Sequence, residues 1–218
     1  SIASGVSPPV TYVLDNEQAV NAFVAGYDSS QSILVVTQGT LEQLSREELQ
    51  GVIGHEFSHI LNGDMRLNMR LLAILAGILA IGQMGGFLMR SVSDTRHHAR
   101  GKDRNNAVPA IFIFGLGLWV IGYIGLFFGR LIKAAVSRER ERLADAASVQ
   151  FTRYPDGLAG ALYKISVNGS HLANLHAEEM SHVCFGESLA FSPLFATHPP
   201  IDERIKAIAP TFLTRVKY

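Results

Sequence analysis

Two long stretches without a charged residue constrain the fold of this chain more than any other feature. Residues 71–89 (LLAILAGILAIGQMGGFLM) hold 19 uncharged positions, and residues 107–129 hold 23. Because a helix rises 1.5 Å per residue, the shorter stretch is about 28 Å long, close to the thickness of a bilayer's hydrocarbon core. The polar segment 90–106 separates the two stretches. This pattern predicts a helical hairpin that crosses a lipid bilayer twice.

The alternative is a pair of helices buried in the core of a soluble protein. Of the 218 residues, 48% are hydrophobic and 17% charged, and the residues outside the two stretches are too few to cover both helices. The formal net charge of +0 gives no basis for binding nucleic acid. Glycines four residues apart, Gly82 with Gly86 and Gly125 with Gly129, would allow close helix packing.

The start of the chain and its cysteine content restrict its cellular context. The first residue is Ser1 rather than methionine, and no secretory signal pattern follows. We therefore expect a processed chain or a fragment of a longer protein. The single cysteine, Cys184, excludes an intramolecular disulfide framework and is typical of a reducing compartment.

The residues before the first apolar stretch predict a small β-sheet and one helix. Residues 10–14 (VTYVL) favour a strand, and residues 19–25 and 32–37 flank the polar turn GYDSSQ, which predicts a hairpin. Ser45 and Glu48 form an S-x-x-E capping box, which predicts the start of an amphipathic helix. Together with the helices that follow, the chain is predicted to be mainly α with a small β-sheet (α+β).

Three further helices are predicted after the second apolar stretch. The first continues from that stretch into the charged segment KAAVSRERERLADAASVQ, and the second follows Pro155. The last (PPIDERIKAIA) begins at two prolines and places Ile201, Ile205 and Ile208 on one face.

The helix that follows Ser45 carries His55-Glu56-Phe57-Ser58-His59, which fits the pattern H-E-x-x-H. Helix positions i and i+4 project from the same face, so both imidazoles can reach one metal ion. Neutral imidazoles are suitable ligands for zinc, and Glu56 lies beside them, where it can accept a proton from water. The pattern is typical of zinc metallopeptidases.

A catalytic zinc site needs a third protein ligand and a position for water. The residues after His59 offer no further histidine at a suitable spacing, so this ligand must come from elsewhere. Glu139 and Glu141 in SRERERLAD are candidates. We favour Glu141, because Asp145 lies one turn further on, where it can orient a ligand histidine. A solvated face of ion pairs, or a ligand from the C-terminal part, are the alternatives.

These motifs occur in an order that resembles a known family. HEFSH, the two apolar stretches, S-R-x-x-E-x-x-A-D (137–145) and T-H-P-P with a downstream Arg-Ile (197–205) resemble the HtpX-like and CAAX prenyl endoprotease family of membrane zinc metallopeptidases. The segment NAFVAG (21–26) resembles the strand before the zinc helix in that family. The size and the hairpin favour the HtpX branch.

The resemblance implies a zincin-like metallopeptidase domain in two parts, residues 1–66 and 134–218. The transmembrane hairpin, residues 67–133 with its polar loop 90–106, would interrupt that domain. HtpX-like proteins carry two further apolar segments before the first strand, and these are absent from this sequence.

The resemblance also implies roles for individual residues. One zinc ion would be bound by His55, His59 and Glu141, with Glu56 as general base. His198 would donate to the oxyanion that forms during peptide hydrolysis. The remaining implied residues are the neighbours of the third ligand and the substrate-binding strand: Ser137, Arg138 and Asp145, and Asn21, Ala22 and Phe23.

The implied substrates are polypeptides, namely membrane or misfolded proteins met near the bilayer during protein quality control under stress. Lysine and arginine are more numerous near the membrane ends on the side of the zinc ligands than in the segment 90–106. By the positive-inside rule, this favours a cytoplasmic active site, in agreement with the resemblance. We expect a multi-pass protein of the plasma (inner) membrane.

Two other functions fit parts of the sequence. A non-catalytic membrane protein could use the zinc site as a structural cross-link, and a soluble metal-binding protein could use the apolar stretches as a core. Glu56, the proposed base, is present, which argues against the first. Other histidines are weaker ligand candidates: His97 and His98 for a second metal site, and His171, His176 and His182 as surface residues.

Overall fold

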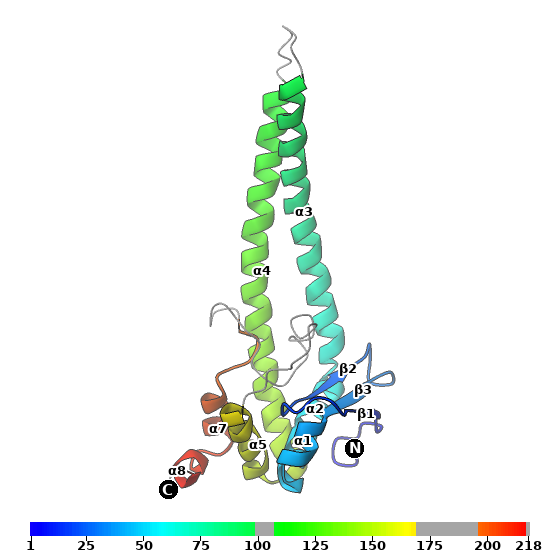
Figure 1. Cartoon of the computed structure of the whole chain (residues 1–218), viewed down its shortest axis with the longest axis vertical. Coiled ribbons are helices and arrows are strands. Elements are labelled where there is room, and N and C mark those ends of the chain that lie inside the picture. The colour runs from blue at the N-terminus through cyan, green and yellow to red at the C-terminus, as the bar shows by residue number, and fades with distance from the viewer. Residues whose placement is uncertain (99–106, 169–195, 217–218) are drawn as a thin grey trace. The chain divides into compact units, whose positions relative to one another are not determined.

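The structure is a computed structural model that describes residues 1–98, 107–168 and 196–216, with the side chains of 93–98, 107 and 168 excepted. It divides into two compact units. One comprises Ser1–Asn68 and Ala134–Tyr218, and the other Met69–Lys133. Figure 1 traces the chain through both units, which are described separately below. Cys184, His171, His176 and His182 lie outside the described residues, as do the side chains of His97 and His98.

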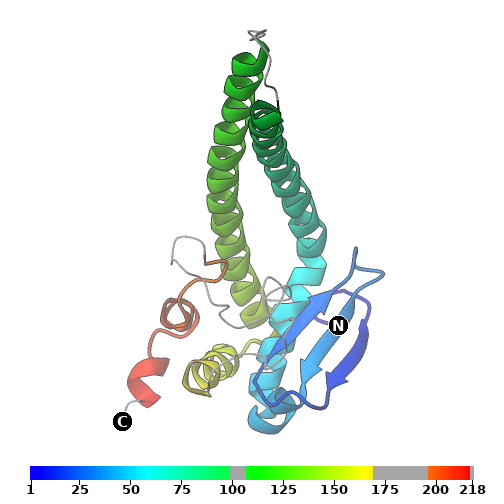
Figure 2. The same ribbon diagram turned by 45° about the horizontal axis from the view of Figure 1, so that its top comes forward.

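A three-stranded sheet opens the first unit (Figure 2). Its strands are β1 (Val10–Leu14), β2 (Ala22–Ala25) and β3 (Ile33–Thr37), in the order β1-β3-β2. β2 and β3 pair antiparallel, which confirms the predicted hairpin. β1 pairs parallel with β3, an arrangement that the sequence did not reveal. β2 is therefore an edge strand.

The two faces of the β2–β3 hairpin follow the alternation of its side chains. Ala22, Val24, Leu34 and Val36 point into the main hydrophobic core, together with buried residues of the helices. Phe23 lies on the other face of the hairpin, where it packs with Val35. Within the described residues, β3 is the one strand that pairs with β2, and the other backbone edge of β2 faces away from the sheet.

Two helices follow the sheet, and side chains define where they start. Thr37 caps the short helix α1 (Gln38–Gln43), which the sequence analysis did not predict. Ser45 is the N-cap of α2 (Arg46–Asn62). Its hydroxyl accepts from the Glu48 backbone amide, and the Glu48 carboxylate accepts from the Ser45 backbone amide. The predicted capping box is confirmed.

The helix α2 lies at the centre of the first unit, and glycines allow its neighbours to approach closely. A Cβ atom on Gly51 would lie 2.7 Å from the backbone nitrogen of Leu158, and one on Gly54 would lie 3.1 Å from Ser148 Oγ. The Ser148 hydroxyl donates to the Gly51 carbonyl at 2.6 Å. These contacts hold α2 against the two segments that follow the hairpin.

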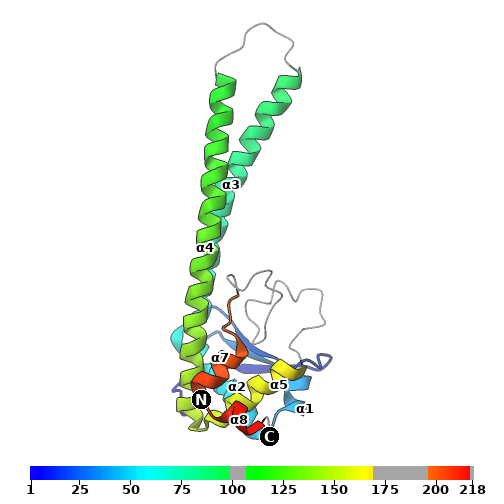
Figure 3. The ribbon, with the colours of Figure 1, turned by 90° about the vertical axis from the view of Figure 1, so that its left-hand side faces the viewer.

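The remaining helices of this unit complete its core (Figure 3). They are α5 (Pro155–Asn168), α7 (Ile201–Ile208) and α8 (Phe212–Val216). Leu158 and Leu162 of α5 and Ile205 of α7 are fully buried. Apolar burial of this kind is the main source of stability for such a unit, at about 2 kcal/mol for each large side chain.

The second unit is an antiparallel pair of helices, formed by parts of α3 (Asp64–His98) and α4 (Ala107–Thr152). α3 extends to His98, so the segment from residue 90, predicted to be a loop, is helical as far as His98. A Cβ atom on Gly122 would lie 2.4 Å from Gly82 Cα, and one on Gly129 would lie 2.6 Å from a Leu75 methyl group. One on Gly125 would lie 3.0 Å from an Ile78 methyl group, so three of the four glycines singled out in the sequence lie at close contacts.

Both of these helices are long and apolar enough to span a membrane, and only 17% of each apolar window is buried. Large side chains such as Phe87, Ile113 and Ile121 are exposed. A helix in the core of a soluble protein would bury most of this surface. Within the described part of the chain, most of the apolar surface of α3 and α4 is uncovered, unlike the surface of a helix in a soluble core. The fold class, mainly α with a small sheet, is confirmed.

Candidate metal centre

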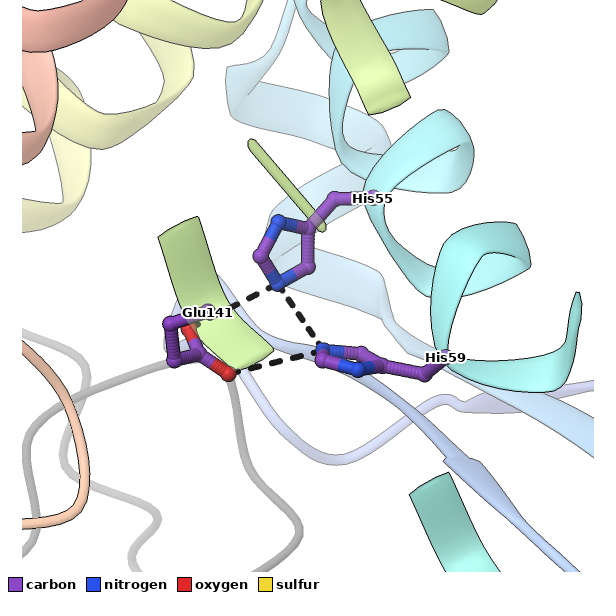
Figure 4. A group of neighbouring side chains, drawn as sticks. All are labelled: His55, His59 and Glu141. Carbon is purple, nitrogen blue, oxygen red and sulfur yellow. Dashed lines mark hydrogen bonds and ion pairs between the residues drawn. The ribbon is translucent and has the colours of Figure 1, made fainter. Parts of the chain in front are cut away.

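His55, His59 and Glu141 bring three potential metal ligands together in the first unit. One ligand atom from each lies within 4.8 Å of the others. His55 Nε2 is 3.1 Å from His59 Nε2 and 3.6 Å from Glu141 Oε2, and His59 Nε2 is 3.4 Å from Glu141 Oε1. In Figure 4 the two imidazoles extend from α2 and the carboxylate from α4 toward a common point.

This donor set fits a divalent metal ion. Zinc binds histidine and carboxylate at about 2.0–2.1 Å, so tetrahedral ligand atoms lie about 3.3–3.4 Å apart. The distances in this cluster lie around that value. Glu139, the alternative third ligand, instead has a 70% exposed side chain and pairs with Arg142. The structure therefore brings Glu141, and not Glu139, to the two histidines.

A carboxylate and an arginine support His55. Asp145 Oδ1 lies 2.9 Å from His55 Nδ1, one turn of α4 beyond Glu141. Arg204 of α7 donates from Nε and Nη2 to the two Asp145 oxygens at 2.8 and 2.7 Å, and its Nη1 is 3.3 Å from Glu141 Oε2. We call these three residues, His55, Asp145 and Arg204, the His55 arm; all of them are buried.

His59 has a similar set of partners from other elements. Its Nδ1 lies 2.6 Å from Asp64 Oδ2, at the first residue of α3. Arg140 of α4 forms an ion pair with Asp64 and donates to the Asn62 carbonyl at 2.9 Å. We call His59, Asp64 and Arg140 the His59 arm. It is less buried, since the Asp64 and Arg140 side chains are 15% and 27% exposed.

Burial and a neighbouring carboxylate act on the two histidines in opposite directions. Burial lowers the pKa of His55, so its imidazole is neutral, as a metal ligand must be. Burial alone would lower the pKa of His59, but the adjacent Glu141 carboxylate raises it. Burial opposes ionisation of Glu141, yet the charges of His198 and Arg204 hold its pKa well below the usual range. A negative charge is thus maintained beside both ring nitrogens.

Glu56 is buried next to the ligand cluster, on the same helix. Burial raises its pKa to about 8. The Val24 backbone amide of β2 hydrogen-bonds its carboxyl group, which partly offsets that effect. A carboxyl group with a raised pKa that lies beside potential metal ligands is suited to exchange protons.

The other predicted site residues of the C-terminal half lie near Glu141. His198 Nδ1 is 3.0 Å from Glu141 Oε2. Arg138 Nη1 donates to the Ala196 carbonyl at 3.3 Å and so contacts the segment that carries His198. Ser137 is half-buried on α4.

Asn21, Ala22 and Phe23, predicted to bind substrate, are buried at the start of the edge strand β2. The Asn21 amide donates to Thr40 Oγ1 at 2.7 Å, and its carbonyl accepts from the Thr37 amide at 3.0 Å. The backbone of Asn21 is therefore engaged within the fold.

Sequence reasoning missed Asp64 and Arg204 as parts of the centre. Arg204 is 3% exposed, although it lies among charged residues in DERIK. The available signal was its spacing, because Arg204 follows Ile201 by three positions and precedes Ile208 by four, on the apolar face of α7. Asp64 gave a weaker signal, as an acidic residue directly after the helix-ending Gly63.

Comparison with known proteins agrees with this geometry. Residues 2–211 match the family described as peptidase family M48. The chain belongs to peptidase family M48. It is 41% identical over 210 residues to the "Protease HtpX homolog" of Dictyoglomus turgidum, which covers 95% of this chain and 65% of that protein. The homologue of the same name from Thermoanaerobacter pseudethanolicus is 37% identical and covers 95% of this chain and 68% of its own length.

These relatives confirm the resemblance to HtpX-like proteins, and this M48 chain spans 65% of the length of the Dictyoglomus protein. The fold is also similar to the crystal structure of S. mikatae Ste24p, with a TM-score of 0.59 and 19% sequence identity. That similarity covers 95% of this chain and 48% of Ste24p. At 19% identity, the similarity to Ste24p supports the fold alone.

Proposed function

We propose that this M48 chain is a zinc-dependent endopeptidase that hydrolyses peptide bonds of membrane or misfolded proteins near a bilayer surface. The observation that carries the proposal is the convergence of His55, His59 and Glu141 beside the buried Glu56. Two imidazoles, one carboxylate and an adjacent carboxylic acid are the groups that metal-assisted hydrolysis requires.

One zinc ion per chain would be held by His55, His59 and Glu141. When bound there, zinc supplies Lewis-acid chemistry, which lowers the pKa of water and polarises a carbonyl group. The donor atoms are mostly buried, and the two arms orient both imidazoles through Nδ1, which leaves Nε2 available as the ligand.

The protein's own residues move the protons. Glu56 takes the proton of the water molecule that attacks the scissile carbonyl, and then gives it to the leaving amine nitrogen. His198 donates to the substrate oxyanion. Its Nδ1 faces Glu141, and its Nε2 is buried without a hydrogen-bond partner among the described residues, so Nε2 is the atom assigned to this role.

The edge strand β2 is proposed to bind substrate backbone. Asn21 bonds toward Thr37 of β3, so by the alternation of antiparallel pairing the polar backbone groups of Ala22 and Val24 face the open edge. The bond from the Val24 amide to Glu56 agrees with that direction. A polypeptide added at this edge would be held by main-chain bonds, which suits broad specificity.

The membrane assignment is proposed from the exposed apolar helices and the chain order. His59 lies only a few residues before α3, and Glu141 lies on α4 itself, after its apolar part. Of the two helices proposed to enter the bilayer, α4 therefore carries Glu141, and α3 begins five residues after His59. The excess of basic residues on that side favours a cytoplasmic active site in the plasma (inner) membrane.

The test compares zinc content and casein cleavage for the wild type and Glu56→Gln, both purified as the full chain in detergent. We expect about one zinc per chain in both proteins, and cleavage by the wild type only. Glu139→Gln is the matched control, since this exposed glutamate should leave both measurements unchanged. Zinc in both proteins without cleavage in either would refute the proposed activity and favour a structural cross-link.

A further inference from the structure

The His59 arm depends on a sharp turn between two helices. α2 ends at Asn62, and α3 begins at Asp64, so Gly63 alone separates them. Gly63 has φ 67°, and its amide bonds to the carbonyls of His59 and Ile60. A side chain would meet no atom within 4 Å there, so the backbone conformation is what requires glycine. This turn places the Asp64 carboxylate within hydrogen-bonding distance of His59 Nδ1.

The contact between Asp64 and His59 defines how the imidazole is used. At 2.6 Å, Asp64 Oδ2 accepts from Nδ1–H, which fixes the tautomer whose Nε2 carries the lone pair. That Nε2 faces His55 and Glu141. Among the described residues, Asp64 is the hydrogen-bond partner that His59 Nδ1 has.

Arg140 holds the turn from the other side. It pairs with Asp64 and donates to the Asn62 carbonyl, so it contacts both residues that flank Gly63. Arg140 also directly precedes Glu141 on α4. Glu141 would therefore supply the third ligand. Its neighbour Arg140 holds Asp64, the carboxylate that orients the second ligand, His59.

Resting on the proposed zinc centre, we propose that Asp64 and Arg140 are positioning residues for the metal ligand His59, equivalent to Asp145 and Arg204 for His55. They orient the imidazole and strengthen its Nε2 as a ligand, and they take no part in proton transfer. Both residues should increase the affinity of the centre for its metal, but by different amounts. Asp64 contacts the ligand directly and contributes more than Arg140, which acts through Asp64.

The experiment titrates the metal-free full chain in detergent with Co²⁺, whose visible spectrum reports the ligand geometry. Competition with a chelator gives the dissociation constant. We expect Asp64→Asn to weaken binding about 10- to 100-fold, the usual cost of losing such a partner. Arg140→Ala should weaken it by a smaller factor, and Arg140→Lys should restore part of the loss because it retains the charge. Adding Arg140→Ala to Asp64→Asn should cost little more, since the two residues act in series.

Arg142→Ala is the matched control, since this exposed arginine of α4 pairs with Glu139 and should leave affinity and spectrum unchanged. Thermal melting of the metal-free variants checks that each one folds. Wild-type affinity and an unchanged Co²⁺ spectrum in Asp64→Asn and Arg140→Ala would overturn the positioning role while leaving the metal centre intact. A wild type that binds no Co²⁺ would overturn both.

Discussion

Soluble proteins usually bury apolar side chains and expose charged ones, and the two units of this chain depart from that pattern in opposite ways. The first unit buries charged groups: Glu56, Glu141, Asp145 and Arg204 are each at most 5% exposed. The second unit exposes large apolar groups, among them Ile121, which is 66% exposed. Burying a charge costs several kcal/mol unless partners compensate it, and exposing an apolar side chain to water forgoes about 1.5–3 kcal/mol.

The buried charges would suit a bound cation, and the exposed apolar side chains would suit a lipid environment. The buried charges of the first unit are arranged around a point where a divalent cation would balance them. The apolar surface of the second unit carries no such penalty in hydrocarbon, because lipid tails are as apolar as the side chains. The contrast teaches that stability in water explains neither feature, whereas the proposed metal centre and membrane location would explain both.

Glu141→Ala should give the largest effect, because it removes the proposed third ligand and a buried charge together. We expect metal affinity to fall more than about 100-fold, beyond the usual cost of losing an orienting partner, with loss of peptidase activity. Zinc content and casein cleavage are the measurements. Glu139→Ala should retain both, and the reverse pattern would mean that the buried carboxylate is not the ligand.

Ile121→Lys tests the other half of the comparison. At the middle of a spanning helix a lysine raises the free energy of membrane insertion by about 3 kcal/mol. The measurement is the fraction of full chain that resists alkaline carbonate extraction, with Ile121→Leu as the control. If the protein were soluble, a lysine at this exposed position would change stability by less than about 0.5 kcal/mol. The carbonate-resistant fraction should therefore fall in Ile121→Lys and stay at the wild-type level in Ile121→Leu; an unchanged fraction in Ile121→Lys would contradict the lipid assignment.

The last expected effect appears only in metal-free protein and concerns Glu56. Its pKa is raised from 4.5 to about 8, so the folded state holds a proton that the unfolded chain releases. Stability contributed by that proton is present at low pH and is lost as the pH rises toward about 8. Glu56→Gln should therefore melt close to the wild type below about pH 4.5, and increasingly above it as the pH rises toward about 8. An equal difference at both pH values would argue against a raised pKa.

Much of the site could be predicted because its first half is local. His55, Glu56 and His59 lie within two turns of one helix, and helix periodicity alone places them together. Glu141 could be chosen over Glu139 because Asp145 follows it by one turn, and the structure places that carboxylate on His55. Each of these inferences used spacing within a single helix.

The parts that were missed depend on contacts between distant segments. No periodicity in residues 10–14 indicates that β1 pairs parallel with β3. Arg204 reaches Asp145 across 59 positions of sequence, and only its place on an apolar helix face pointed to burial. Asp64 reaches His59 through the left-handed conformation of Gly63, a backbone feature that composition cannot specify.

The order of the ligands along the chain has a consequence for biosynthesis. His55, His59 and Glu56 precede both apolar stretches, and Glu141 follows them. Because a ribosome makes the N-terminal residues first, a nascent chain that ends within the second apolar stretch holds the base and both imidazoles but lacks the carboxylate ligand. The centre is completed only after the whole hairpin has been synthesised. Translation order alone therefore delays completion of the proposed centre until both apolar stretches have been made.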